Sequence, residues 1–549
     1  MGDLANTYEP APDHVPSSHH SKRPGSHRLR ASAGLVAVLC LLPLVYLLVR
    51  TLEIAPAIWP ILTRPRTLSV GFNSIMLAAT VTMGAVIIGT AMAWLTTRTD
   101  LPGRRFWAAV TLLPLVLPSY VGAFALIAAL GPNGMLQSLL APLGVERLPS
   151  MYGFPGACLA LTLFTYPYVQ LCVRASLRGL DPCAEEAARS LGLSAGRAFR
   201  KVMLPQLQPA IRAGALLAAL YALSDFGAVS LLQFDSFTRA IHVQYTGALD
   251  RSAAAVLALM LVALTFIILA LEHRTRGQAA YYRGSAGVPR AQRRSRLGPW
   301  RWPAAAFCGS IAFLALGIPL LVTGYWLAQG WVAGESLLPN GAIIVNSVTA
   351  SGMAAVVAVM AALPVVILSV RHPSSRFGRA AEACAYIGHA LPGIVVALAL
   401  VFFSARYLPF FYQTILMLIL AYVVLFLPMA LGAVRASLLQ ISPRIEEAAR
   451  TLGHTPRSAL WHVTLPLLRP GLLTGMALVF LTCMKELPAT LFLGPTGFHT
   501  LATRIWGATE EAFFARAAVP ALLLVGVSAL SLWIMWWHEE KDKRWSVTP

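Results

Sequence analysis

Long apolar runs dominate the sequence, and short polar or arginine-rich segments separate them. A helix rises about 1.5 Å per residue, so about 18 apolar residues suffice to cross a hydrocarbon core about 30 Å thick. Twelve runs reach this length. The pattern predicts an all-α polytopic membrane protein with about 12 transmembrane helices, at 34–52, 73–95, 106–130, 152–175, 213–232, 253–271, 304–327, 346–370, 381–403, 411–434, 472–491 and 519–537.

The runs fall into two sets of six, which divides the chain into five predicted parts. Segment 273–303, between the sets, carries eight arginines and neither Asp nor Glu. We expect it to be a basic cytoplasmic linker, and its charge allows a secondary role in binding anionic lipid headgroups. The other parts are a disordered cytoplasmic tail (1–33), a first transmembrane half (34–272), a second transmembrane half (304–538) and a cytoplasmic C-terminal tail (539–549).

The two halves resemble each other in register, which indicates duplication of one structural unit. Each second helix opens with Asn-Ser at an offset of 273, each third helix contains Leu-Pro at an offset of 274, and later motifs lie 261 apart. A longer outer loop in the first half, at 131–151, accounts for the smaller offset. Both halves keep the same orientation, so we expect a parallel repeat about an axis along the membrane normal.

The formal net charge of +20 reflects topology rather than cargo. With the N-terminal tail placed inside and the spans alternating, most of the 43 Lys and Arg residues fall on inner segments, which is the positive-inside bias. Both termini are then cytoplasmic. The seven cysteines are scattered without CxxC or metal-ligand spacing, so we expect no metal, cofactor or catalytic site in this chain.

Two polar segments, 181–205 and 442–466, align without a gap, and each lies at the same place in its half. Each has the pattern of a short helix, a turn and a second helix. N-cap residues followed by proline begin the first helix, and a glycine ends it. Leu-Pro pairs are expected to end the second helix. These positions are Asp181, Ser442, Gly192, Gly453, Leu204-Pro205 and Leu465-Pro466.

The first helix of each segment is predicted to face water with its arginines and its Glu-Glu pair, and to carry a small apolar ridge. Ala187 with Leu191, and Ala448 with Leu452, are spaced four apart and share one face. Such a ridge can enter a groove on a partner protein. An amphipathic helix on the membrane surface is the alternative, but two copies in identical register favour the partner.

Both segments match the EAA loop of ABC importer permeases: Glu-Ala-Ala, three residues, Gly, nine residues, a hydrophobic residue, any residue, Leu-Pro. The resemblance implies a type I importer fold in which two copies of a cytoplasmic ATPase hold one loop each, and an external solute-binding protein delivers cargo. The residues implied to couple to the ATPases are Glu185, Glu186, Ala187, Ala188, Leu191, Gly192, Glu446, Glu447, Ala448, Ala449, Leu452 and Gly453.

This chain is not expected to be an enzyme. A P-loop needs Gly-Lys before Ser or Thr, and none of the five lysines follows a glycine. ATP would therefore bind to the separate ATPase chain. A secondary transporter with 12 spans is the rival class, but it would need neither loop.

Three ionisable residues lie within predicted spans: Asp225, Lys485 and Glu486. The two acids are 261 apart, so they are equivalent positions of the repeat. Such groups face the bundle interior or a water-filled path. We consider two roles equally: a pair of acids beside a cation pathway, or a structural ion pair or helix-break cap near Pro488.

Four residues near the outer ends, His242, Arg239, His499 and Arg504, are candidates for contact with the binding protein, although solvated loop charges are the favoured interpretation.

Segments 485–506 and 224–230 resemble the fused ferric iron permeases of bacterial inner membranes, whose duplicated single-chain layout this chain shares. The resemblance implies ferric iron as substrate. His499 departs from the Asp or Asn common at that position. Thiamine and aminoethylphosphonate permeases of the same superfamily remain the alternatives.

Overall fold

The computed structural model describes residues 26–53, 55–132, 134–145, 148–180, 182–275, 295–335 and 341–545. Within these ranges the chain is helical, and its one β feature is an isolated bridge between Thr99 and Ser295. Most of the predicted N-terminal tail (1–25), most of the linker (276–294) and the last four residues lie outside the described residues.

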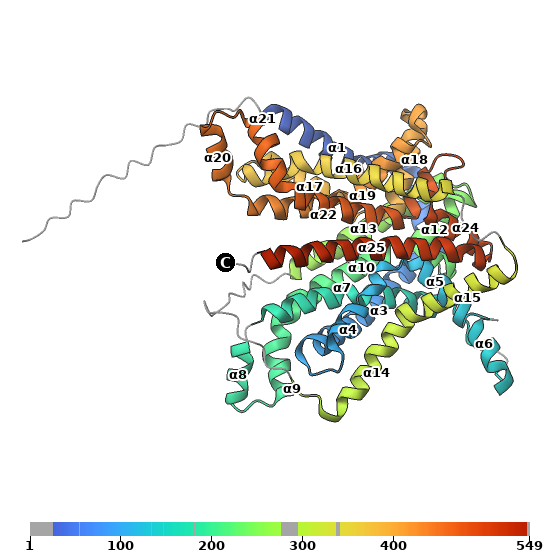
Figure 1. The fold of residues 1–549 in the computed structure, drawn as a ribbon. Helices are drawn as coiled ribbons and strands as arrows, with labels where there is room; N and C mark the ends of the chain where they lie inside the picture. Colours follow the sequence, from blue (N-terminus) through green and yellow to red (C-terminus); the bar gives the residue numbers. More distant parts are fainter. Residues whose placement is uncertain are drawn as a thin grey trace, which may run out of the picture.

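The helices follow the two predicted sets (Figure 1). The first comprises α1 (Ser26–Glu53), α2 (Ala55–Leu62), α3 (Pro65–Arg98), α4 (Arg104–Val110), α5 (Ser119–Leu130), α6 (Met135–Leu140), α7 (Phe154–Gly179), α8 (Pro182–Ser190), α9 (Ala195–Ala198), α10 (Leu204–Ser224), α11 (Gly227–Leu231), α12 (Phe237–Thr246) and α13 (Arg251–Thr275).

The second set comprises α14 (Arg301–Ala312), α15 (Ile318–Val332), α16 (Gly341–Arg371), α17 (Arg376–Ala390), α18 (Gly393–Tyr407), α19 (Ile415–Gln440), α20 (Pro443–Thr451), α21 (Pro456–Ala459), α22 (Leu465–Lys485), α23 (Pro488–Leu493), α24 (Leu501–Glu510) and α25 (Phe514–Trp545). Short 3-10 or π segments join some of them: η1 (Leu113–Val116), η2 (Ala141–Leu143), η3 (Phe199–Met203), η4 (Gly298–Trp300), η5 (Phe313–Gly317), η6 (Pro409–Phe411) and η7 (Leu460–Thr464).

The predicted all-α polytopic fold is confirmed. Among the described residues, ten helices are long and apolar enough to cross a membrane, and the bent pair α17 and α18 makes an eleventh. The twelfth predicted run falls on α25, whose described apolar part is Phe514–Ala529.

Four predicted spans are broken rather than continuous, so the predictions at 106–130, 213–232, 381–403 and 472–491 were wrong in this respect. In the third and ninth spans the break falls at Leu117-Pro118 and Leu391-Pro392, where both leucines have extended backbone. Proline forces this conformation on the residue before it. The fifth and eleventh spans end at Ser224 and Lys485, and a short helix follows each break.

Three helices form the centre of each half: α3, α7 and α10 in the first, and α16, α19 and α22 in the second. Small residues allow the close approach. A Cβ atom on Gly89 of α3 would lie 2.6 Å from the Tyr166 carbonyl oxygen, and one on Gly214 of α10 would lie 2.6 Å from Val169 Cα. Packing of this kind, with small residues at the contact, is typical of membrane helices.

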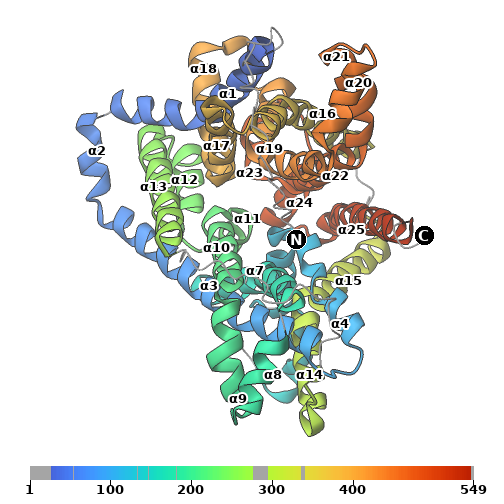
Figure 2. The same cartoon turned by 90° about the vertical axis from the view of Figure 1, so that its left-hand side faces the viewer.

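The first span of each half packs on the other half. α1 lies against α16, α17 and α18, while α14 and α15 lie against α4 and α5 (Figure 2). The Tyr46 hydroxyl of α1 donates to the Phe402 carbonyl oxygen of α18 at 3.2 Å. The five-part division of the chain stays a prediction. Helices of each half pack on helices of the other half.

The Asn-Ser pairs lie within α3 and α16 rather than at their starts, and their equivalent contacts confirm the register of the repeat. Each asparagine amide donates to a backbone carbonyl oxygen at 3.2 Å, and each serine hydroxyl accepts the first N–H of the following outer helix. The bonds are Asn73 to Asp235 and Phe237 to Ser74 in the first half, and Asn346 to His499 and Leu501 to Ser347 in the second.

Candidate coupling loops and membrane pathway

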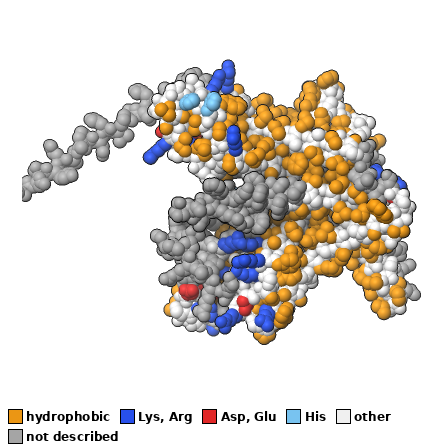
Figure 3. Space-filling view, in the orientation of Figure 1, with side chains coloured by type: hydrophobic (Ala, Val, Ile, Leu, Met, Phe, Trp, Pro, Cys, Tyr) orange, Lys and Arg blue, Asp and Glu red, His pale blue; other side chains and the backbone are white. Residues whose placement is uncertain are grey.

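The two matched loops lie at the same end of the molecule and far apart from each other. Both views place α8 with α9 on one side and α20 with α21 on the other (Figures 1 and 2). Lys and Arg side chains gather mostly at this end, while an apolar belt covers the middle of the visible face (Figure 3). This arrangement agrees with the positive-inside interpretation of the sequence.

The local signals of the loops act as predicted. The Ser442 hydroxyl accepts the Arg444 N–H at 3.4 Å. After the turn a second cap begins α21, where the Thr455 hydroxyl accepts the Ser458 N–H at 3.3 Å. Gly192 and Gly453 have φ of 87° and 92°, a region in which a side chain is strained, and each ends its helix in a Schellman pattern. The predicted cap Asp181 lies outside the described residues.

The prediction that Leu-Pro ends the second helix was wrong. In both loops the chain continues through a π-helical turn, η3 or η7, directly into α10 or α22. Proline within an α-helix clashes with the carbonyl four residues earlier and lacks an N–H. The wider π turn before Pro205 and Pro466 accommodates the ring, so each loop connects rigidly to a transmembrane helix.

The predicted apolar ridges are open to solvent. Leu191 is 85% exposed and Leu452 is 83% exposed, and Ala187 and Ala448 beside them are also exposed. The neighbouring Ala188 and Ala449 are buried against the rest of each loop. Each loop therefore presents one large leucine that nothing in the described chain covers.

The prediction that both acids of each pair face water was wrong for the first acid. Arg98, at the end of α3, pairs with Glu185 at 3.8 Å, and Arg371, at the end of α16, pairs with Glu446 at 2.8 Å. Arg371 also donates to the Ile441 carbonyl oxygen at 3.1 Å. The second acids, Glu186 and Glu447, are exposed as predicted.

These arginines anchor the loops to the transmembrane bundle, and sequence reasoning missed them. A signal was available, because Arg98 and Arg371 are 273 residues apart, the same offset as the Asn-Ser pairs. Nothing local to either arginine indicated its partner.

The two buried acids occupy equivalent places at the breaks. Asp225 Oδ2 accepts the N–H groups of Ala228 at 2.9 Å and Val229 at 3.3 Å, which begin α11. Glu486 Oε1 accepts the N–H of Ala489 at 3.2 Å, at the start of α23. Of the two structural roles considered, this geometry is the helix-break cap, and among the described residues neither acid forms an ion pair.

Each acid also contacts the first residue after the Leu-Pro break of its own half. The Ser119 hydroxyl donates to Asp225. At the equivalent position, 274 residues later, stands Gly393, and a Cβ atom there would lie 2.6 Å from Glu486 Oε1. The shorter acid therefore meets a serine, and the longer acid meets a glycine that leaves room for it.

Lys485 does not face Glu486. Its Nζ donates to the Leu115 carbonyl oxygen in η1, at 2.9 Å, across the boundary between the halves. Whether Asp225, Lys485 and Glu486 line a translocation path stays a prediction.

An aromatic cluster joins the halves at the outer end. The His242 ring lies 4.9 Å from Phe226, 5.7 Å from Phe492 and 6.4 Å from Trp506, centroid to centroid. Burial, with the charge of Arg239 as a lesser cause, lowers the pKa of His242 below its ordinary value. His242 is thus a packed residue rather than a solvated loop charge, which corrects the favoured interpretation.

The other three outer candidates are more peripheral. Arg239 pairs with Asp235, just before its own helix, and His499 and Arg504 are exposed. Their role in contact with a binding protein stays a prediction.

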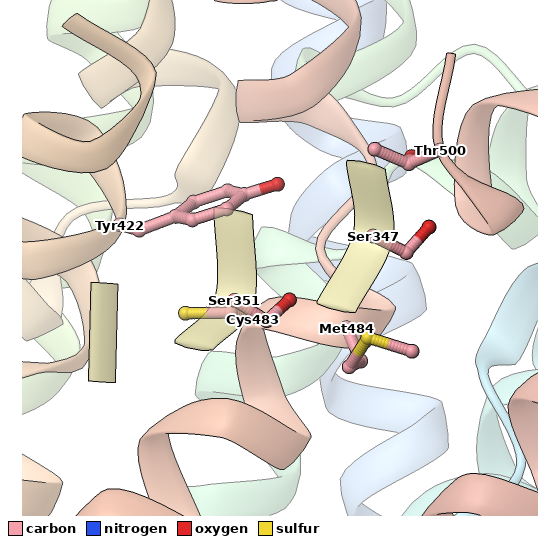
Figure 4. A pocket seen from close by; sticks show the side chains of 6 residues that line it. All are labelled: Ser347, Ser351, Tyr422, Cys483, Met484 and Thr500. Atoms are coloured by element: carbon pink, nitrogen blue, oxygen red, sulfur yellow. The ribbon is translucent and has the colours of Figure 1, made fainter. Parts of the chain in front are cut away.

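A small pocket lies in the second half beside the end of α22. Its lining side chains, which Figure 4 shows, are Ser347, Ser351, Tyr422, Cys483, Met484 and Thr500. Part of this polar lining is already engaged, because Ser347 accepts the Leu501 N–H at 2.8 Å. In the described part of the chain, no group of three or more His, Cys, Asp or Glu could hold a metal ion.

Fold and loops together define a duplicated, multi-pass membrane permease. Residues 85–274 and 354–543 each match the family described as the binding-protein-dependent transport system inner membrane component. The chain therefore belongs to this family of ABC importer permeases of the inner membrane, and it is a transport protein. The two matches leave out α1, α14 and α15, the helices that pack on the opposite half.

The chain is similar along most of its length to permeases that also carry both halves. It is 35% identical to the Fe(3+)-transport system permease protein FbpB 2 of Haemophilus influenzae, over 90% of this chain and 95% of the relative. It is 24% identical to the ferric transport system permease protein FbpB of Actinobacillus pleuropneumoniae, over 84% of this chain and 70% of the relative. The sulfate transport system permease protein CysT of Salmonella typhimurium is 32% identical, but over only 37% of this chain.

Proposed function

We propose that this chain forms the translocation pathway of an ATP-driven importer of ferric iron, and that α8 and α20 each seat on one of two cytoplasmic ATPase subunits. A solute-binding protein would deliver the cargo to the outer end. Both termini would be cytoplasmic, on the side of α8 and α20.

The observation that carries the proposal is the pair of exposed leucines, Leu191 and Leu452. Each stands directly after a short helix, α8 or α20, that an arginine anchors. The loop then continues through α9 or α21 and a π turn into a transmembrane helix. Burying a leucine in a partner's groove gains about 1.5–3 kcal/mol, so two open leucines in equivalent places favour a pair of identical partners.

The proposal of iron rests on the relatives. The Haemophilus influenzae permease, whose name states Fe(3+) transport, matches both halves and nearly its full length. The sulfate permease matches less than half of this chain. Iron is therefore favoured over another solute carried by the same architecture.

Coupling can be tested with the purified complex of this permease, its ATPase and its binding protein. Leu191→Asp together with Leu452→Asp should weaken ATPase recruitment about tenfold or more, because each aspartate would have to be buried in an apolar groove. Leu139→Asp is the matched control: Leu139 is 72% exposed on α6, at the opposite end of the molecule, so recruitment should not change (Figure 1).

The substrate can be identified by measuring ATP-dependent uptake of ferric iron, thiamine, aminoethylphosphonate or sulfate by the wild-type complex in proteoliposomes. ATP-dependent uptake of iron is the expected result. Uptake of another solute in place of iron would contradict the substrate, while normal ATPase recruitment by the double leucine variant would contradict the coupling role.

A further inference from the structure

One polar contact joins the broken helices of the two halves. Lys485 ends α22 in the second half, and its Nζ lies 2.9 Å from the carbonyl oxygen of Leu115 in the first half. Leu115 belongs to η1, the short turn between α4 and α5.

The break explains why the Leu115 carbonyl oxygen needs a donor. In a continuous helix it would accept the N–H four residues on, that of Ser119. Leu117 and Pro118 are extended here, so η1 ends and α5 begins anew at Ser119. A carbonyl at the end of a helical segment carries partial negative charge and is stabilised by a cation, which Lys485 supplies.

The Lys485 ammonium group has the Leu115 carbonyl oxygen as its hydrogen-bond partner among the described residues. No carboxylate of the described residues lies within ion-pair distance of its Nζ. The nearest acid in sequence, Glu486, caps α23 instead, and Asp225 caps α11. An ammonium group within a membrane is costly without a hydrogen-bond partner. The bond to the Leu115 carbonyl oxygen therefore favours the arrangement of the two halves in which this contact is made.

In the part of the chain that the structure describes, the contact exists on one side of the repeat only. The position equivalent to Lys485, 261 residues earlier, is Ser224, which ends α10. A serine cannot reach across as lysine does. The acids tie each break to its own half, through Ser119 and Gly393, whereas Lys485 ties the halves to each other.

We propose that Lys485 is a positioning residue for transport: its bond to the Leu115 carbonyl oxygen is a latch that holds the halves together at the break in this conformation and must open when they move apart. The proposal rests on the proposed function. α22 runs through η7 to the loop that carries α20, so movement of that loop reaches Lys485 along one helical path.

The test uses the permease with its ATPase and binding protein in proteoliposomes. Lys485→Met keeps the length of the side chain and removes the donor, so ATP hydrolysis without binding protein should rise about fivefold or more, and less cargo should move per ATP. Lys485→Arg keeps a cationic donor and should stay close to wild type. Ser224→Ala, at the equivalent position, is the matched control and should change neither quantity.

A second measurement covers the case in which Lys485→Met assembles poorly. Leu115→Cys with Lys485→Cys, in a chain without its native cysteines, is joined by a short reducible bismaleimide. Crosslinking should stop ATP-driven transport, and reduction should restore it.

If an assembled Lys485→Met complex hydrolyses ATP without binding protein at the wild-type rate and moves as much cargo per ATP as the wild type, the latch proposal is contradicted. Full transport by the crosslinked protein would contradict it as well. A wild-type complex that recruits no ATPase would instead contradict the proposed function, and the two failures are thus distinguishable.

Discussion

At the scale of single residues, the breaks show how a repeat can change its side chains and keep its geometry. Asp225 with Ser119, and Glu486 with Gly393, fill equivalent places with different residues. The carboxylate in each case caps a short helix, which supplies the hydrogen bonds that a charged group in a membrane requires.

Gly393→Ala should therefore destabilise the protein. The new Cβ atom would lie 2.6 Å from Glu486 Oε1, so the carboxylate would have to move away from the Ala489 N–H that it caps, and loss of a buried hydrogen bond of this kind costs about 1–3 kcal/mol. The melting temperature of the detergent-purified chain should fall by several degrees. Gly432→Ala is the matched control, since a Cβ atom there meets nothing within 4 Å, and an equal loss in both variants would contradict the argument.

His242 should make the outer end sensitive to acid. Because burial lowers its pKa in the folded state, the unfolded chain binds a proton first as pH falls through about 6.5. Stability is thus complete above that pH and decreases below it. His242→Phe keeps a ring among Phe226 and Trp506 and cannot titrate.

The measurement compares the melting temperatures of wild type and His242→Phe at pH 7.5 and 5.5, values chosen about one unit either side of the ordinary histidine pKa. The wild type should lose more stability on acidification than the variant. Equal losses would show that His242 does not titrate in this range.

At the scale of elements, the two candidate coupling loops are equal in sequence pattern and unequal in anchoring. The Arg371–Glu446 pair is shorter than the Arg98–Glu185 pair by 1.0 Å, and Arg371 holds the Ile441 carbonyl oxygen as well. Charge-assisted hydrogen bonds depend steeply on such distances.

Glu446→Gln should consequently reduce ATP-driven uptake more than Glu185→Gln, by about fivefold, the factor that about 1 kcal/mol represents. Initial uptake rates in proteoliposomes measure the difference. The double variant Arg371→Glu with Glu446→Arg restores an ion pair, so its uptake rate should exceed that of Glu446→Gln. A stronger effect of Glu185→Gln would mean that the first loop is the better anchored one in the working complex.

Local patterns explain which elements the sequence could predict. Ser442, Thr455, Gly192 and Gly453 act within a few residues of themselves, so the loops were predicted almost to their ends. The four broken spans were not, because long apolar runs surround each break: a Leu-Pro pair marks two of the breaks, and a single acid, Asp225 or Glu486, marks the other two. Pairings such as Arg98 with Glu185 depend on helix packing, which the sequence does not display.

At the scale of the whole molecule, the exchange of first helices should hold the two halves together without the linker. α1 packs on α16, α17 and α18, and α14 and α15 pack on α4 and α5. A protease site inserted within 276–294 allows the chain to be cut after purification. The fragments should stay together in gel filtration in mild detergent, and fragments that separate would contradict this role for the exchange.

The contact between Tyr46 and Phe402 spans 356 residues, and that between Glu53 and Arg406 spans 353. α1 therefore leaves the ribosome long before α18, on which it packs, has been synthesised. Until then it can pack only on its own half, where it contacts α13. Assembly of this permease is complete only when the second half arrives and α1 docks upon it.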